Sequence, residues 1–155
     1  GIYPAVNVMA EDLRLLRQLG FTRVETDQGG WNPVNLYALG RLLWDPAQAW
    51  ESLLADFCRH YGAAAAAMTA YWRDLERALR GQPGYIADLG GSQQALLARK
   101  DECLAELSRL IAAAADPVTR DRLTRETAAW EHFGERAYLR ATLPEPFRHH
   151  WPLKT

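Results

Sequence analysis

NPVNLYALGRLLWDP, residues 32–46, is the stretch that decides the fold class of this chain of 155 residues. Asn32 is a preferred helix N-cap, and Pro33 suits the first helical position because the N–H that proline lacks is not used there. Leucines then recur every three or four residues, at positions 36, 39, 42 and 43. This spacing predicts a helix from Pro33 with these leucines as its core face.

The helical pattern continues far beyond this stretch. Asp45-Pro46 repeats the Asn-Pro pattern of a helix start, with Gln48 as the capping-box partner. It predicts a helix that ends at Gly62. Further helices are predicted over 63–80, 92–115 and 117–142, and Asp116-Pro117 is expected to cap the last of them. Residues 32–142 should therefore form a bundle of about five helices. Residues 143–155 are expected to be an irregular tail.

Large apolar residues on the helical stripes are predicted to form the core. The side chains that we expect to be buried are Trp50, Phe57, Trp72, Leu107 and Trp130, together with the thiols of Cys58 and Cys103.

Residues 1–31 are predicted to form a strand–helix–strand unit. The pattern favours a strand over 2–8, a helix over 10–19 that ends at Gly20, and a strand over 21–26. Strands connected in this way lie parallel, but two short strands are not an independent sheet. Their edges therefore need partners, either earlier strands of a larger α/β domain or another copy of the chain. The fold class is mainly α, with a strand–helix–strand unit before a helical bundle.

Composition excludes several classes of function. The net charge is −1 and the isoelectric point is near 6.5, so no basic field attracts nucleic acid. No apolar run approaches the ~20 residues that a membrane span needs. Two cysteines make no disulfide framework, and the sequence contains no Gly-x-Gly-x-x-Gly, Walker or Gly-x-Ser-x-Gly motif. No cofactor is expected.

The most functional-looking segment is VETDQGGWN, residues 24–32. It lies at the carboxyl end of the second predicted strand, where α/β proteins place their ligand sites. Glu25 and Asp27 can accept hydrogen bonds from sugar hydroxyls, Trp31 can stack on a pyranose ring, and Asn32 adds an amide. The alternative is a solvated turn before a capped helix, with Trp31 as a hydrophobic staple.

Metal binding is not expected. Asp56 and His60 lie one helical turn apart, but no third ligand has clear spacing, so a hydrogen-bonded pair is the favoured interpretation.

Four runs along the first half of the chain resemble the bacterial family known as domain of unknown function 4838. They are NLYALGRLLWDP (35–46), LLADF (53–57), YGAA (61–64) and MTAY (68–71). The resemblance covers roughly residues 8–80, and the Leu-Leu-Trp-Asp-Pro run is its most specific part.

The resemblance implies an architecture and an activity class. Members of this family carry a glycoside-hydrolase-like barrel, akin to alpha-glucuronidases and beta-hexosaminidases, followed by helices. Residues 1–31 would then be the end of a (β/α)8 barrel, with Glu25, Asp27, Trp31 and Asn32 at the rim of the substrate site. The acid/base carboxylates of such enzymes come from earlier strands, so no residue here is assigned as catalytic. The resemblance also implies a secreted or periplasmic protein.

Two functions follow as expectations. The first is the C-terminal portion of a carbohydrate-active, glycoside-hydrolase-like protein, inactive as an isolated fragment, whose partners are a carbohydrate and the preceding barrel. The second is a non-enzymatic helical module for interaction or dimerisation.

Overall fold

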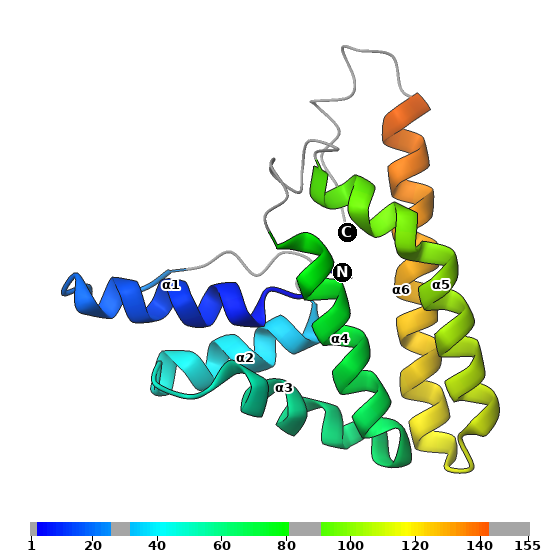
Figure 1. Cartoon of the computed structure of the whole chain (residues 1–155), viewed down its shortest axis with the longest axis horizontal. Helices are drawn as coiled ribbons and strands as arrows, with labels where there is room; N and C mark the ends of the chain where they lie inside the picture. Colours follow the sequence, from blue (N-terminus) through cyan, green and yellow to red (C-terminus); the bar gives the residue numbers. More distant parts are fainter. Residues whose placement is uncertain (1–2, 26–31, 81–90, 143–155) are drawn as a thin grey trace. The chain divides into compact units, whose positions relative to one another are not determined.

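The computed structural model describes residues 3–25, 32–80 and 91–142, and these residues are mainly α-helical, as predicted (Figure 1). They divide into two compact units, Tyr3–Glu76 and Arg77–Thr155. None of the described helices is both long enough and apolar enough to cross a membrane.

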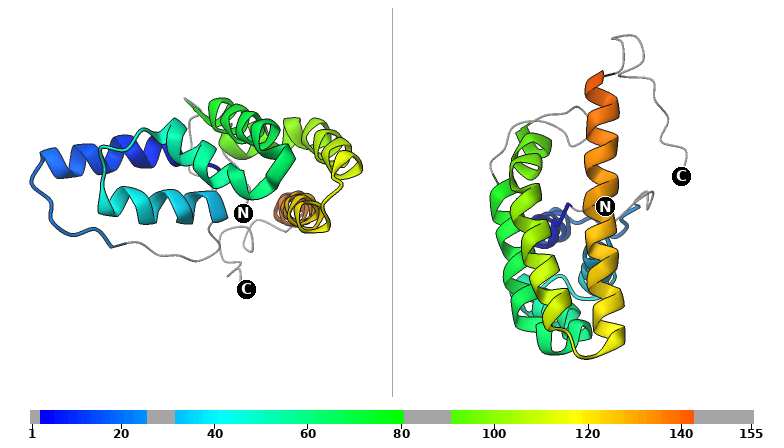
Figure 2. Two further views of the ribbon diagram at one scale, coloured as in Figure 1. Left: turned by 90° about the horizontal axis from the view of Figure 1, so that it is seen from below. Right: turned by 90° about the vertical axis from the view of Figure 1, so that its right-hand side faces the viewer.

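The first unit contains three α-helices, a short 3₁₀ segment and a fourth α-helix up to Glu76. Their bounds are α1 (Val6–Gln18), α2 (Pro33–Trp44), α3 (Trp50–Cys58), η1 (Arg59–Ala64) and α4 (Ala65–Leu79). Helices α1, α2 and α3 pack against one another, as the views in Figures 1 and 2 show.

Helix α1 begins earlier than the sequence predicts. The amides that precede and open it find acceptors on distant helices: Ala5 N–H donates to Asn35 Oδ1 at 2.9 Å, and Asn7 N–H donates to Glu76 Oε1 at 2.6 Å. Helix starts leave such amides without intrahelical partners, so these acceptors stabilise a helix from Val6. The prediction of a strand over residues 2–8 is therefore wrong for residues 6–8, which are helical.

The second predicted strand, over 21–26, is also not formed where the structure describes it. Residues 21–25 have no regular secondary structure. A strand is held by hydrogen bonds to a neighbouring strand, and the described ranges 3–25, 32–80 and 91–142 contain no strand that could provide them. Helix α1 does end as predicted, because Gly20 follows it with a φ of 85°.

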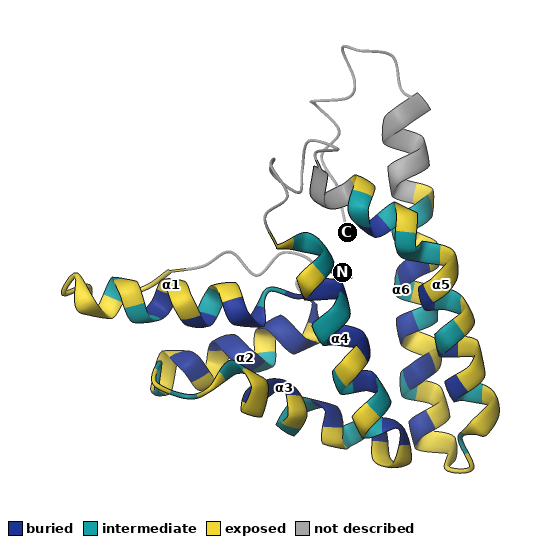
Figure 3. Ribbon diagram, viewed as in Figure 1, coloured by how far each residue is buried: buried dark blue, intermediate teal, exposed yellow. Residues whose placement is uncertain are grey.

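Helix α2 has the predicted start and a different core face. The side chain of Asn32 caps it by accepting from Val34 N–H at 2.9 Å, with Pro33 in the first turn. Leu39 and Leu42 are buried, but Leu36 and Leu43 are exposed. The ribbon of α2 accordingly shows both buried and exposed residues (Figure 3). Smaller residues take their places in the core, since Val34, Asn35 and Ala38 are buried instead.

The Asp45-Pro46 pair does not start a helix, contrary to the prediction. Asp45 is the C-cap of α2, and α3 begins only at Trp50 with Ala49 as its N-cap. Gln48 is not a capping-box residue, because its amide donates to the carbonyls of Arg41 and Asp45 at 3.0 and 3.2 Å. These bonds close the connection over 45–49.

The core of the first unit is formed mainly by α3, η1 and α4. Its largest fully buried side chains are Trp72, Tyr61, Leu42, Leu53, Leu54, Met68 and Leu75. The burial of Trp72 confirms its prediction, whereas Trp50 and Phe57, which were also predicted to be buried, are only half-buried. The chain turns at Gly62, where φ is 55° and ψ is −125°.

The second unit contains an antiparallel helix pair, α5 (Gly91–Ala113) and α6 (Pro117–Thr142), which pack along their length (Figure 2). Asp116 starts α6 as predicted: its carboxylate accepts from Thr119 N–H at 2.8 Å and from Thr119 Oγ1 at 2.7 Å. Leu107 and Trp130 are fully buried, which confirms both predictions. Cys58 and Cys103 are buried free thiols, also as predicted.

Candidate functional site

Of the four residues predicted to bind a sugar, the structure describes two, Glu25 and Asn32. Asp27 and Trp31 lie outside the described residues. Glu25 is exposed and forms an ion pair with Arg23, in which the side chains are 75% and 83% exposed. Such an exposed pair is easily exchanged for a ligand contact, because surface ion pairs contribute little to stability.

Asn32 differs from Glu25 in being almost fully buried, at 2% exposure. Its Oδ1 is used by the cap of α2, whereas its Nδ2 makes no hydrogen bond within the described part of the chain. The structure therefore gives Asn32 a structural role as the helix cap.

A polar cluster around Asp56 joins α2 to α3. The Asp56 carboxylate, whose side chain is 23% exposed, accepts from Tyr37 Oη and pairs with Arg59 and, at 3.5 Å, with Arg41. Arg41 also donates to Tyr37 Oη at 3.2 Å and to Gln48 Oε1 at 3.1 Å. Three donors on one carboxylate fix its position, so the cluster fastens the two helices.

His60 belongs to an aromatic group beside this cluster. Its Nδ1 lies against the carbonyl oxygen of Phe57, and its ring is 4.5 Å from the Phe57 ring and 3.9 Å from the Tyr61 ring, centre to centre. Among the described residues, no group of three His, Cys, Asp or Glu side chains is arranged to hold a metal ion. Asp56 therefore belongs to the polar cluster between α2 and α3, and His60 packs against Phe57 and Tyr61.

Apolar side chains are exposed on the outer faces of α1 and α2. On α1 they are Val8 and Leu15, which the helical repeat places on one side, followed by the C-cap residue Leu19. On α2 they are Leu36, Leu43 and Trp44. Trp44 is 91% exposed. Several exposed apolar side chains on one helix face mark a place where another molecule or segment binds more often than a single exposed leucine does.

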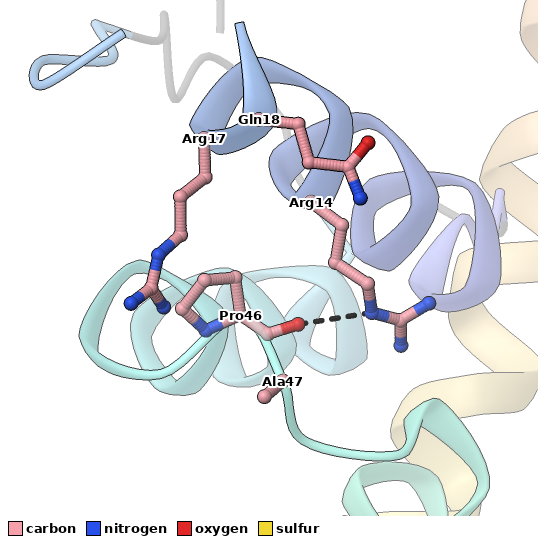
Figure 4. A pocket seen from close by; sticks show the side chains of 5 residues that line it. All are labelled: Arg14, Arg17, Gln18, Pro46 and Ala47. Atoms are coloured by element: carbon pink, nitrogen blue, oxygen red, sulfur yellow. Dashed lines mark hydrogen bonds between the residues drawn. The ribbon is translucent and has the colours of Figure 1, made fainter. Parts of the chain in front are cut away.

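A shallow pocket of about 360 Å³ lies where the last turn of α1 faces the connection between α2 and α3 (Figure 4). Its lining residues are Arg14, Arg17, Gln18, Pro46 and Ala47. Arg14 bridges the two elements, because its Nε donates to Pro46 O at 3.0 Å and its Nη2 to Gln48 O at 3.1 Å.

Sequence reasoning did not single out this pocket. Its two arginines stand three residues apart on α1, and such a pair on a helix surface is usually solvated. The signal that could have found them is the Asp45-Pro46 break, because a chain reversal after α2 brings that connection back toward α1.

The comparisons with known proteins give a family for the first half of the chain. A search of curated proteins and a search of solved structures found no match. A family model described as "Domain of unknown function (DUF4838)" matches residues 1–74. This range contains α1, α2, α3, η1 and the first part of α4. Residues 1–74 of the chain therefore belong to the DUF4838 family.

Proposed function

We propose that the chain is the C-terminal portion of a carbohydrate-active, glycoside-hydrolase-like protein and is inactive by itself. The observation that carries the proposal is the surface of the segment after α1. Phe21 and Val24 are 58% and 37% exposed, and the outer face of α1 is apolar as well. Apolar surface on a family domain is stabilised when a neighbouring element covers it, and the sheet of a preceding barrel would do so.

In this proposal the segment 24–32 supplies the rim of a sugar site. Glu25, released from its exposed pair with Arg23, accepts hydrogen bonds from sugar hydroxyls, and Asp27 does the same. Trp31 offers a ring face to a pyranose. Asn32 caps α2 and thereby holds the end of the segment in place.

The experiment that tests the proposal compares two proteins. One is this chain, and the other is the same chain with the coding sequence that precedes it in its gene. Both are measured for binding to an array of glycans and for release of reducing sugar. Binding and hydrolysis by the longer protein alone support the proposal. Failure of the longer protein to bind any glycan contradicts it.

A dimerisation module is the second candidate, and the exposed face of α2 favours it. Leu36, Leu43 and Trp44 lie on both sides of Gly40, where an added Cβ would meet nothing within 4 Å. A second copy crossing α2 at this glycine could approach closely, with Leu36 of each copy against Leu43 and Trp44 of the other.

Sedimentation of two matched variants separates the candidates. Leu43→Asp places a charge on the α2 face, and Leu15→Asp places the same charge on α1. A dimeric chain that becomes monomeric with Leu43→Asp alone supports the module. A chain that is monomeric at all concentrations excludes it.

A further inference from the structure

The pocket between α1 and the α2–α3 connection holds two guanidinium groups in different states. Arg14 is half-buried, and two of its nitrogens are held by the carbonyls of Pro46 and Gln48. The side chain of Arg17 is exposed, and no hydrogen bond or ion pair links its guanidinium to a described residue. The pocket therefore combines a fixed cation with a cation that is available to a ligand (Figure 4).

The rest of the lining is uncharged. Pro46 and Ala47 give an apolar wall, and Gln18 brings an amide that can donate and accept. A guanidinium binds a carboxylate or a phosphate through two parallel hydrogen bonds, which are stronger than bonds between neutral groups. The apolar wall suits the carbon face of a ring that carries such a group.

The helix end does not oppose an anion strongly. The last turn of a helix presents carbonyl oxygens with partial negative charge. In α1 three of these four oxygens accept hydrogen bonds from the chain that follows: Leu19 N–H donates to Leu15 O, Phe21 N–H to Leu16 O, and Gly20 N–H to Arg17 O. The two arginines add two positive charges at this end of the helix.

We propose that this pocket is a binding site for the oxyanion group of a small ligand, with Arg17 as its direct partner and Arg14 as the fixed second cation. The oxyanion can belong to a sugar acid or be free phosphate. The proposal does not depend on the proposed function, because the pocket lies apart from the segment 24–32 in the sequence. A sugar acid as ligand would extend that function to acidic carbohydrates.

The test is an NMR titration of the ¹⁵N-labelled chain, which follows the amides of Gln18 and Ala47 and the Nε–H of Arg17. The probes are glucuronate, inorganic phosphate and glucose, at constant ionic strength. Glucose differs from glucuronate at the carboxylate position alone. We expect glucuronate or phosphate to shift these signals saturably and glucose to leave them unchanged. A tighter response to glucuronate identifies a sugar acid, and a tighter response to phosphate identifies the free ion.

Two matched variants complete the test. Arg17→Gln removes the free cation, and Arg125→Gln removes one exposed charge from α6 in the other unit. Arg17→Gln should weaken the binding about tenfold, the scale of one charge-assisted pair, while Arg125→Gln leaves it unchanged. Equal shifts with glucose, equal effects of the two variants, or no saturable shift with either anion would overturn the proposal.

Discussion

The carboxylate of Glu76 on α4 accepts a hydrogen bond from the backbone N–H of Asn7 in the first turn of α1, at 2.6 Å and across 69 positions of sequence. Both residues are buried, at 5% exposure each. The bond gives an acceptor to an amide that no residue of its own helix can satisfy, and a carboxylate at a helix start also interacts favourably with the helix dipole. The bond therefore connects α1, which lies within the residues 1–74 that match the family model, to a residue just after that range.

Removal of this carboxylate should destabilise the first unit. We expect Glu76→Ala to lower the free energy of unfolding by about 1–3 kcal/mol, because it leaves the Asn7 amide buried without its acceptor. Glu76→Gln keeps an oxygen at that place and should cost less. Urea unfolding followed by circular dichroism measures both. Glu102→Ala is the control and should change little, because the Glu102 side chain that pairs with Arg99 is 71% exposed. A loss for Glu102→Ala as large as that for Glu76→Ala would refute this role of the bond.

Gly62 is the backbone position most sensitive to a side chain. Its φ of 55° combined with a ψ of −125° is a conformation that residues with a Cβ rarely adopt. Gly62→Ala should therefore destabilise the chain by about 1–3 kcal/mol. Gly40→Ala is the matched control, because it lies within a helix and its added methyl meets nothing within 4 Å. It should be neutral or slightly stabilising. Thermal unfolding of the two variants checks the prediction, which fails if Gly62→Ala is as stable as the wild type.

Each unit contains one buried thiol, so labelling can follow each unit separately. Cys58 is 0% exposed and Cys103 is 4% exposed, and burial raises the pKa of the Cys103 thiol. Both should react slowly with a thiol reagent at pH 8 because both are buried, and the raised pKa of Cys103 also reduces its share of the reactive thiolate form.

Leucines one turn from each cysteine provide the matched variants. Leu54→Ala on α3 and Leu107→Ala on α5 should each cost about 2–5 kcal/mol, as core truncations do. Leu54→Ala should speed the labelling of Cys58 most, and Leu107→Ala that of Cys103. Leu15→Ala, at a site that is 53% exposed, should alter neither rate. Rapid labelling of both cysteines in the wild type would contradict the described cores.

The stability that Asp116 contributes at the start of α6 should depend on pH. Hydrogen bonds from Thr119 hold the pKa of Asp116 below its ordinary value of 3.8. A carboxyl group whose pKa is lowered by folding stabilises the folded state fully above its ordinary pKa, and this contribution is lost as the pH falls through the lower folded value. The wild type should therefore exceed Asp116→Ala in stability at pH 7, and the difference should shrink below about pH 4. Acid titrations of the two proteins by circular dichroism measure it, and a constant difference down to pH 2 would disprove the effect.

Local signals in the sequence predicted the helices and several of their ends. The caps at Asn32 and Asp116 and the stop at Gly20 use atoms within a few residues, so a sequence pattern can show them. The start of α1 was missed for the opposite reason. Its acceptors on Asn35 and Glu76 lie 30 and 69 positions away, and no periodicity reveals them.

The core faces were predicted less well than the helices. Leucine spacing favoured Leu36 and Leu43 as core residues, but the packing of α1 and α3 against α2 buries Val34, Asn35 and Ala38 instead. Small side chains permit that close packing, and the larger leucines remain exposed. The pocket residues were missed because Arg14 and Pro46 meet only after the chain has folded back.

The central claim is that the segment 24–32 binds a sugar in the longer protein. The most direct measurement is the sugar affinity of that protein and of its Trp31→Ala variant, with the thermal midpoint of each recorded alongside. The account predicts that Trp31→Ala weakens binding by about 1–3 kcal/mol, the scale of a lost aromatic contact, and leaves the midpoint nearly unchanged because Asn32 still caps α2. An unchanged affinity together with a large fall in the midpoint would contradict it and make Trp31 a structural residue.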